Sequence, residues 1–160
     1  MIEKLRAIYP HSIRPADLLS HMIEGLHYFN CFEFAFRLIE APVVLGEFRK
    51  YEAVVFDPMM VEALMANLAQ KQFSEIVDGD LVIYCTDTGV THAGITGAKR
   101  VLSKWGTGYV WFHGTFEIPA EYGQIVRYYA APPLELMVER FRIHALKQLE
   151  EFRQELEARS

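Results

Sequence analysis

The stretch "FNCFEFAF" at residues 29–36 places Cys31 directly before an apolar run with helical spacing. A cysteine nucleophile reacts as the thiolate, and a helix N-terminus lowers the pKa of a thiol from its usual ~8.5 through the helix dipole and unpaired N–H groups. The same N–H groups can hold the oxyanion that forms when a thiolate attacks a carbonyl. Free cysteines are also among the most buried residue types, so Cys31 is either a core thiol or a nucleophile.

A histidine suited to act as a base stands in "GDLVIYCTDTGVTHAGI" at residues 79–95. A predicted strand ends in a polar loop, and His92 opens the next strand, followed by the small residues Ala93 and Gly94. Small residues permit the close approach of a backbone or a substrate. His92 therefore either points into the mouth of a cleft or is an edge-strand histidine bonded to a nearby carbonyl.

Helices flank a run of short strands in the predicted order of elements. Apolar spacing and N-terminal Pro or Asp residues predict helices at residues 15–27, 31–40, 58–71 and about 132–158. Apolar and β-branched segments predict strands at residues 81–85, 91–96, 101–105, 109–114 and 124–130. The Gly-containing segment "GAKR" is a tight turn between the second and the third of these strands.

This order predicts one α+β domain over residues 1–160. A mostly antiparallel five-stranded sheet follows the N-terminal helices, and a C-terminal helical extension closes the chain. The 160 residues are 51% hydrophobic, which suits a single core. The last helix has one apolar stripe and a highly charged C-terminal half. That half is expected to project from the domain or to pair with a second chain as a homodimer.

The segments "NCFEFA", "GDLVIY" and "HAGI", in this order, resemble the NlpC-like branch of the papain-like cysteine hydrolases over about residues 28–130. In that branch the nucleophilic cysteine begins a helix. The base histidine begins the strand that follows a Gly-Asp-apolar strand. The resemblance implies a papain-like fold in which the helix of the nucleophile packs on the sheet. It maps Cys31 to the nucleophile and His92 to the general base, and it implies a small peptide or peptidoglycan-like amide as substrate.

The polar group that orients the base lies, in that branch, on the next strand and is often His, Asn or Gln, where this sequence has "VLSKWG". A hairpin that turns at "GAKR" sets His92 opposite Lys104 or Trp105, with Ser103 beside them. Ser103 and Trp105 then share one face of the strand, and Lys104 takes the other. Ser103 can accept a hydrogen bond from the imidazole. A protonated Lys104 cannot, and its charge would lower the pKa of His92.

Further candidates surround these residues. His113 in "WFHG" is a second candidate to orient the base, or else a buried strand histidine. Asn30 is expected to cap the helix that begins at Cys31. The candidate substrate-binding residues are Asn30, Tyr28, Trp105 and His113.

Composition excludes several other classes of protein. The net charge is −5 without a basic stripe, which argues against a nucleic-acid partner. No apolar run approaches the ~18 residues of a membrane span, and no signal-peptide core is visible, so a cytoplasmic location is expected. Two cysteines make no disulfide framework. The sequence has no phosphate-binding glycine motif and no metal-ligand spacing such as H-E-x-x-H, so no cofactor and no metal are expected.

Three functions are compatible with these observations. The first hypothesis is a cysteine hydrolase of the peptidase or amidase type. In it His92 takes the proton of Cys31 and water then hydrolyses the acyl-enzyme. The second is a papain-like scaffold that binds without cleaving, because the usual third polar residue is missing. The third is a thioester-forming acyltransferase, since fold analogy alone does not separate these activities.

Overall fold

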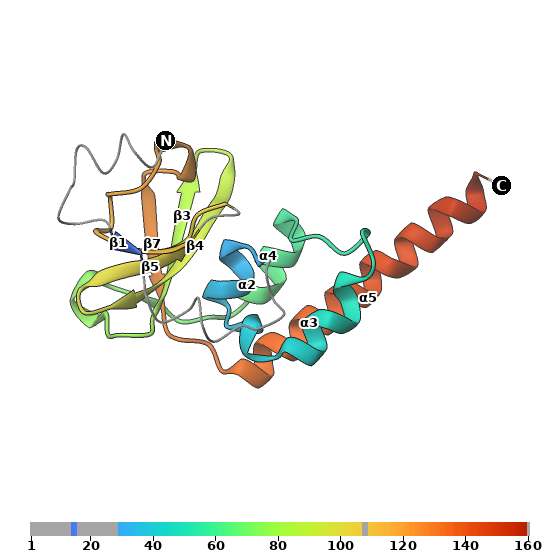
Figure 1. Cartoon of the computed structure of the whole chain (residues 1–160), viewed down its shortest axis with the longest axis horizontal. Helices are drawn as coiled ribbons and strands as arrows, with labels where there is room; N and C mark the ends of the chain where they lie inside the picture. Colours follow the sequence, from blue (N-terminus) through green and yellow to red (C-terminus); the bar gives the residue numbers. More distant parts are fainter. Residues whose placement is uncertain (1–13, 16–28, 107–108, 160) are drawn as a thin grey trace.

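Short strands that alternate with tight turns form one antiparallel sheet, and the protein is α+β as the sequence predicts (Figure 1). The computed structural model describes residues 14–15, 29–106 and 109–159. The strand order is β1-β6-β5-β4-β3-β7-β2, and every pairing is antiparallel. The strands are β1 Arg14–Pro15, β2 Gln70–Lys71, β3 Leu81–Thr86, β4 Gly89–Gly97, β5 Arg100–Lys104, β6 Val110–His113 and β7 Ile125–Tyr129.

The predicted number of five strands is wrong, although β3 to β7 confirm the five predicted segments. The described sheet has seven strands because β1 pairs with β6 at one edge and β2 pairs with β7 at the other. Each of these edge strands has two residues. Two residues are too few to show an alternating pattern, so the sequence contains no periodic signal for them.

Four α-helices and three 3₁₀ turns complete the described chain. The α-helices are α2 Cys31–Ala35, α3 Pro42–Arg49, α4 Pro58–Met65 and α5 Leu134–Ala158, and the 3₁₀ turns are η1 Leu38–Glu40, η2 Phe73–Glu75 and η3 Ala120–Tyr122. The predicted helices 31–40 and 58–71 are too long. Arg37 and Asn67 adopt left-handed φ angles of 62° and 58°, a conformation that ends an α-helix. The predicted helix 15–27 lies almost entirely outside the described residues.

Alternate residues of the sheet face two separate apolar clusters. On the side where Figure 1 shows the helices, Leu81, Ile83 and Ala93 pack with residues of α2, α4 and α5, which we call the helix-side cluster. On the opposite side lies the outer cluster, which consists of Val82, Tyr84, Val101, Trp105, Trp111 and Ile118. Both faces of β3 are therefore covered, which explains why "LVIYC" is a continuous apolar run.

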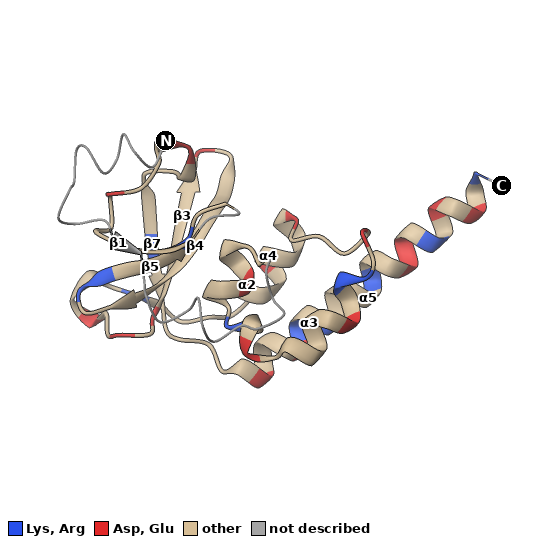
Figure 2. Ribbon diagram, viewed as in Figure 1, with Lys and Arg blue, Asp and Glu red and all other residues tan. Residues whose placement is uncertain are grey.

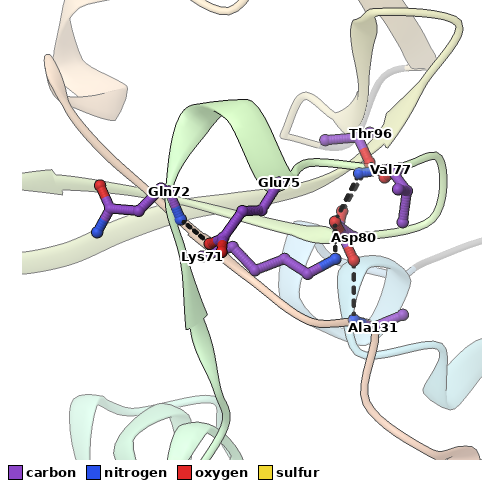
Figure 3. Close-up of polar contacts among 7 residues, drawn as sticks. All are labelled: Lys71, Gln72, Glu75, Val77, Asp80, Thr96 and Ala131. Carbon is purple, nitrogen blue, oxygen red and sulfur yellow. Dashed lines mark hydrogen bonds and ion pairs between the residues drawn. The ribbon is translucent and has the colours of Figure 1, made fainter.

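A buried carboxylate, Asp80, ties four segments together (Figure 3). Its side chain accepts hydrogen bonds from the Lys71 ammonium at 2.7 Å, from the Val77 amide at 2.8 Å and from the Ala131 amide at 3.2 Å. Its carbonyl oxygen accepts from the Thr96 amide at 2.8 Å. Burial alone would raise the pKa of this carboxyl, but the hydrogen bonds outweigh it and lower the pKa. The Asp of "GDLVIY" therefore has a structural role, holding the start of β3 against β2, β4 and the segment that leads into α5.

The long helix α5 extends beyond the rest of the molecule, with charges of both signs along its projecting part (Figures 1 and 2). Its first half packs in the helix-side cluster through Met137, Phe141 and Ala145. Every residue from 150 to 159 is exposed. Although α5 has 25 residues, none of the helices in the described part of the chain combines the length and apolarity needed to cross a membrane.

Gly94 in "HAGI" is predicted to tolerate no side chain. A Cβ at this position would lie 2.6 Å from the Leu102 carbonyl oxygen and 2.9 Å from the Ser103 Cβ. We expect Gly94→Ala to lower the free energy of unfolding by about 1–3 kcal/mol, measured by urea denaturation. The matched control is Gly46→Ala in α3, where a Cβ meets nothing within 4 Å. That change should raise stability by up to about 1 kcal/mol through helix propensity. Equal effects of the two substitutions would contradict the prediction.

Candidate active site

A reciprocal cap fixes Cys31 as the first residue of α2. The Asn30 side chain accepts hydrogen bonds from the amides of Phe32 and Glu33, both at 2.9 Å, and the Glu33 carboxylate accepts from the Asn30 amide at 2.7 Å. This arrangement is a capping box, so the prediction that Asn30 caps the helix is confirmed. Arg49 of α3 then pairs with Glu33 at 3.1 Å and ties the first turn of α2 to the next helix.

The Cys31 thiol is neutral at pH 7. Burial raises its pKa to about 11, and the nearby Glu33 carboxylate adds to this increase. The backbone amides of Ala93, Cys31 and Phe32 act in the opposite direction, because their N–H groups favour the thiolate. The helix start therefore supplies the expected amide donors, but they lower the pKa of Cys31 too little to ionise the thiol at pH 7.

His92 lies beside an irregularity in the β3–β4 pair. Tyr84 pairs with His92 and Cys85 pairs with Val90, so Thr91 is an extra residue that forms a β-bulge. A bulge increases the local twist and redirects the neighbouring side chain. His92 shares a sheet face with its partner Tyr84, on the side of the outer cluster, whereas Ala93 belongs to the helix-side cluster.

The His92 ring is almost completely enclosed, with 1% of its surface exposed. It stacks on the Tyr122 ring with a centroid distance of 4.1 Å and an interplanar angle of 8°. Within the described part of the chain its Nε2 atom has no hydrogen-bond partner. Burial lowers the pKa of His92 to about 3, with a smaller contribution from His113, so the ring is neutral at pH 7.

Ser103 does not orient His92. The register pairs Ser103 with Gly94, and its hydroxyl lies 2.8 Å from His113 Nε2. His113 Nδ1 lies 2.7 Å from the Gly114 carbonyl oxygen, which accepts the ring proton and leaves Nε2 as the acceptor for Ser103. Trp105 Nε1 in turn donates to the Ser103 oxygen at 2.9 Å. His113 is therefore a buried strand histidine with both ring nitrogens bonded, one of the two alternatives that the sequence left open.

The remaining candidates are distributed around this region. Lys104 is 4% exposed and places its Nζ 5.1 Å from the centroid of the Phe29 ring. Burial lowers the pKa of Lys104. Trp105 packs in the outer cluster and stacks on Trp111 at 5.4 Å. Tyr28 lies outside the described residues.

One pocket of about 690 Å³ brings the two principal candidates together. Its described lining residues are Phe29, Asn30, Cys31, Glu33, Arg49, Thr91, His92, Gly106 and Tyr122. Ser103, Lys104, Trp105 and His113 do not line this pocket. In the part of the chain that the structure describes, no hydrogen bond joins the Cys31 thiol to the His92 ring.

Sequence reasoning missed Tyr122, which lies in the segment "IPAEYG" that was taken only as a connection. Its ring covers His92. Burial raises the pKa of its hydroxyl, and the negative charge that the nearby Cys31 sulfur carries when ionised adds to this increase. The only local signal is the glycine that follows it. Gly123 has a φ of 93°, and a Cβ there would collide with the Cys85 backbone, so this turn is built for a close approach to β3.

Comparison of the chain with models of protein families, with curated proteins and with solved structures finds no match.

Acidification is predicted to destabilise the protein through His92 and His113, two buried histidines whose pKa values are lowered. Burial lowers the pKa of His92 to about 3 and that of His113 to about 4, both below the unfolded value near 6.5. Between these values the unfolded chain binds more protons than the folded one, so this stability is present above pH ~6.5 and is lost as the pH falls. Between pH 6 and 4.5 we expect a loss of up to about 2.7 kcal/mol per pH unit, measured by urea unfolding.

His92→Asn provides the comparison for this measurement, since one titrating group is then removed and the slope should fall to about half. A free energy of unfolding that stays constant between pH 7 and 5 would show that these histidines are not held neutral.

Proposed function

We propose that this protein is a cysteine hydrolase that cleaves an acyl bond, with Cys31 as the nucleophile and His92 as the general base. The observation that supports this proposal is a single pocket that is lined by both side chains, one from the start of a helix and the other from a strand. The His92 Nε2 atom adds to it, because this atom is buried, has no hydrogen-bond partner among the described residues, and an unsatisfied buried polar atom is costly unless it has a use.

Both groups are neutral at rest, so the proposed reaction proceeds by general-base catalysis rather than through a preformed thiolate. The Cys31 sulfur bonds to the carbonyl carbon of the substrate while the thiol proton passes to the His92 ring. That transfer needs direct contact between the two groups or one bridging water. The amides at the start of α2 are suited to stabilise the oxyanion.

The cycle closes with the release of the two products. His92 gives the proton to the leaving nitrogen or oxygen as its bond to the carbonyl carbon breaks, which leaves a thioester on Cys31. Water then attacks the thioester while His92 takes a proton from it. The carboxylic acid leaves, and the proton returns to the Cys31 sulfur.

A small peptide or amide is the proposed substrate. The pocket volume of about 690 Å³ lies within the range of small-ligand sites. Its wall offers the aromatic rings of Phe29 and Tyr122 and the charged pair of Arg49 and Glu33, which suits a ligand with both apolar and polar groups. A peptidoglycan-like peptide and a cytoplasmic location remain predictions that follow from the resemblance and the sequence.

Binding without cleavage is the second candidate function. It is favoured by the neutral thiol and by the absence, among the described residues, of a polar side chain bonded to the His92 ring. An acyltransferase is the third, and it differs from the hydrolase only in the acceptor that takes the acyl group from Cys31.

Acyl-enzyme formation tests these candidates. With p-nitrophenyl acetate as the acyl donor, we expect an acetyl thioester on Cys31 in the mass spectrum and repeated release of nitrophenolate. His92→Asn should slow acylation by about 10²-fold or more, which is the usual contribution of a general base. Cys85→Ser is the matched control, because Cys85 is buried in β3, and it should leave the rate unchanged. A single turnover that becomes multiple only with an added amine would indicate a transferase, and no adduct would indicate a binding protein.

We propose a second copy of this chain as the partner of α5. Phe152 and Leu156 continue the stripe of Phe141 and Ala145, and their exposed fractions are 48% and 51%. The same exposed stripe on a second copy is self-complementary about a two-fold axis, and pairing of the two stripes would remove apolar surface from water. Removing residues 150–160, which leaves the buried Gln148 and its hydrogen bonds to Val55 and Asp57 in place, should convert a dimer to a monomer in light scattering. An intact chain that is monomeric at micromolar concentration would overturn this proposal.

A further inference from the structure

We propose that Tyr122 is the positioning residue that orients the His92 ring, in place of the hydrogen-bonded polar side chain that cysteine hydrolases ordinarily use. This inference rests on the proposed roles of Cys31 and His92. A general base such as His92 is effective only when its ring is held in one orientation. Neither Ser103 nor His113 bonds to His92, and its Nε2 atom has no partner in the described chain.

The contact between the two rings is close and nearly parallel. The centroids of His92 and Tyr122 lie 4.1 Å apart at an angle of 8°, whereas Tyr84, the strand partner of His92, lies at 5.7 Å and 43°. A nearly parallel ring at this distance restricts rotation of the imidazole out of its plane, because a large tilt brings its atoms into collision with the tyrosine. Stacking therefore fixes the plane of the base.

Tyr122 can impose an orientation only if it is itself held in place. Its carbonyl oxygen accepts a hydrogen bond from the Thr91 hydroxyl at 2.7 Å, so η3 is bonded to the bulge residue that precedes His92. Its ring meets the edge of the Trp105 ring at 6.4 Å and 69°. The close approach of Gly123 to the Cys85 backbone holds the other end of the turn against β3.

The network of Ser103 and His113 then gains a role that direct contact with His92 does not provide. Ser103 accepts from Trp105 Nε1, and His113 Nε2 accepts from Ser103. These bonds fix the indole that supports Tyr122, and Tyr122 covers His92. Residues of "SKWG", "WFHG" and "PAEYG" therefore together support the ring of His92 through Tyr122. On this proposal no hydrogen-bonding residue is needed on the strand that follows the base.

The test separates the ring of Tyr122 from its hydroxyl. Tyr122→Phe keeps the stacked ring, and Tyr122→Leu removes it. Two readouts are measured for each folded variant, namely the acylation rate with p-nitrophenyl acetate and the ring-proton resonances of His92. In the natural protein and in Tyr122→Phe we expect upfield-shifted His92 resonances and similar acylation rates. In Tyr122→Leu the upfield shift should disappear, and the rate should fall by about 10-fold to 100-fold with little change in half-saturation.

The outcomes distinguish this proposal from the proposed function. If Tyr122→Leu acylates at the natural rate while His92→Asn does not, His92 is the base and Tyr122 does not position it. If His92→Asn acylates at the natural rate, the proposed function fails instead. The magnetisation transfer between the His92 and Tyr122 ring protons needs no variant. Its absence in the natural protein would overturn the proposal even if Tyr122→Leu does not fold.

Discussion

The arrangement of this protein depends on one buried carboxylate. Asp80 is 1% exposed and accepts hydrogen bonds from Lys71 in β2, from Val77 before β3 and from Ala131 after β7. A buried charge is tolerated only when it is paired and bonded, so these partners are constrained as strongly as the carboxylate is. The start of β3 thereby becomes a fixed point, and both neighbours of β3 and the path into α5 are set relative to it.

The two halves of the candidate site reach the pocket from the two sides of the same strand, β4. Ala93 faces the helix-side cluster, and its amide acts on the Cys31 sulfur. His92 faces the side of the outer cluster, where Tyr122 covers it. Gly94, next in sequence, has no room for a Cβ beside β5. Three successive residues of "HAGI" are thus constrained by three different neighbours. His92 is covered by the Tyr122 ring, Ala93 packs in the helix-side cluster, and Gly94 is held against β5.

Much of the fold follows from local patterns, and the parts that do not follow have identifiable causes. The five longer strands, the cap at Asn30 and the turn at "GAKR", where Ala98 and Lys99 have positive φ angles, are local features and were predictable. The end of α2 was not, because Arg37 leaves the helix without a glycine, asparagine or proline to mark the position. The end of α4 had a local signal that was overlooked, since Asn67 is a residue type that favours the left-handed conformation. The hydrogen bond between Ser103 and His113 was not predicted. The alternation of side chains along a strand tells which face of the sheet a residue occupies, but it does not tell which neighbour has a free hydrogen-bond acceptor. Tyr122 lies thirty residues beyond His92 along the chain, and only tertiary packing joins the two rings.

The stack of rings behind His92 has an optical consequence. Trp105 and Trp111 are the only tryptophans in the chain, and both belong to the outer cluster, with their rings 5.4 Å apart. Trp105 meets the edge of Tyr122, which lines the pocket. All of the tryptophan fluorescence of this protein therefore comes from one pair of rings, which only Tyr122 separates from the pocket. The intrinsic fluorescence should thus respond to ligand binding in the pocket.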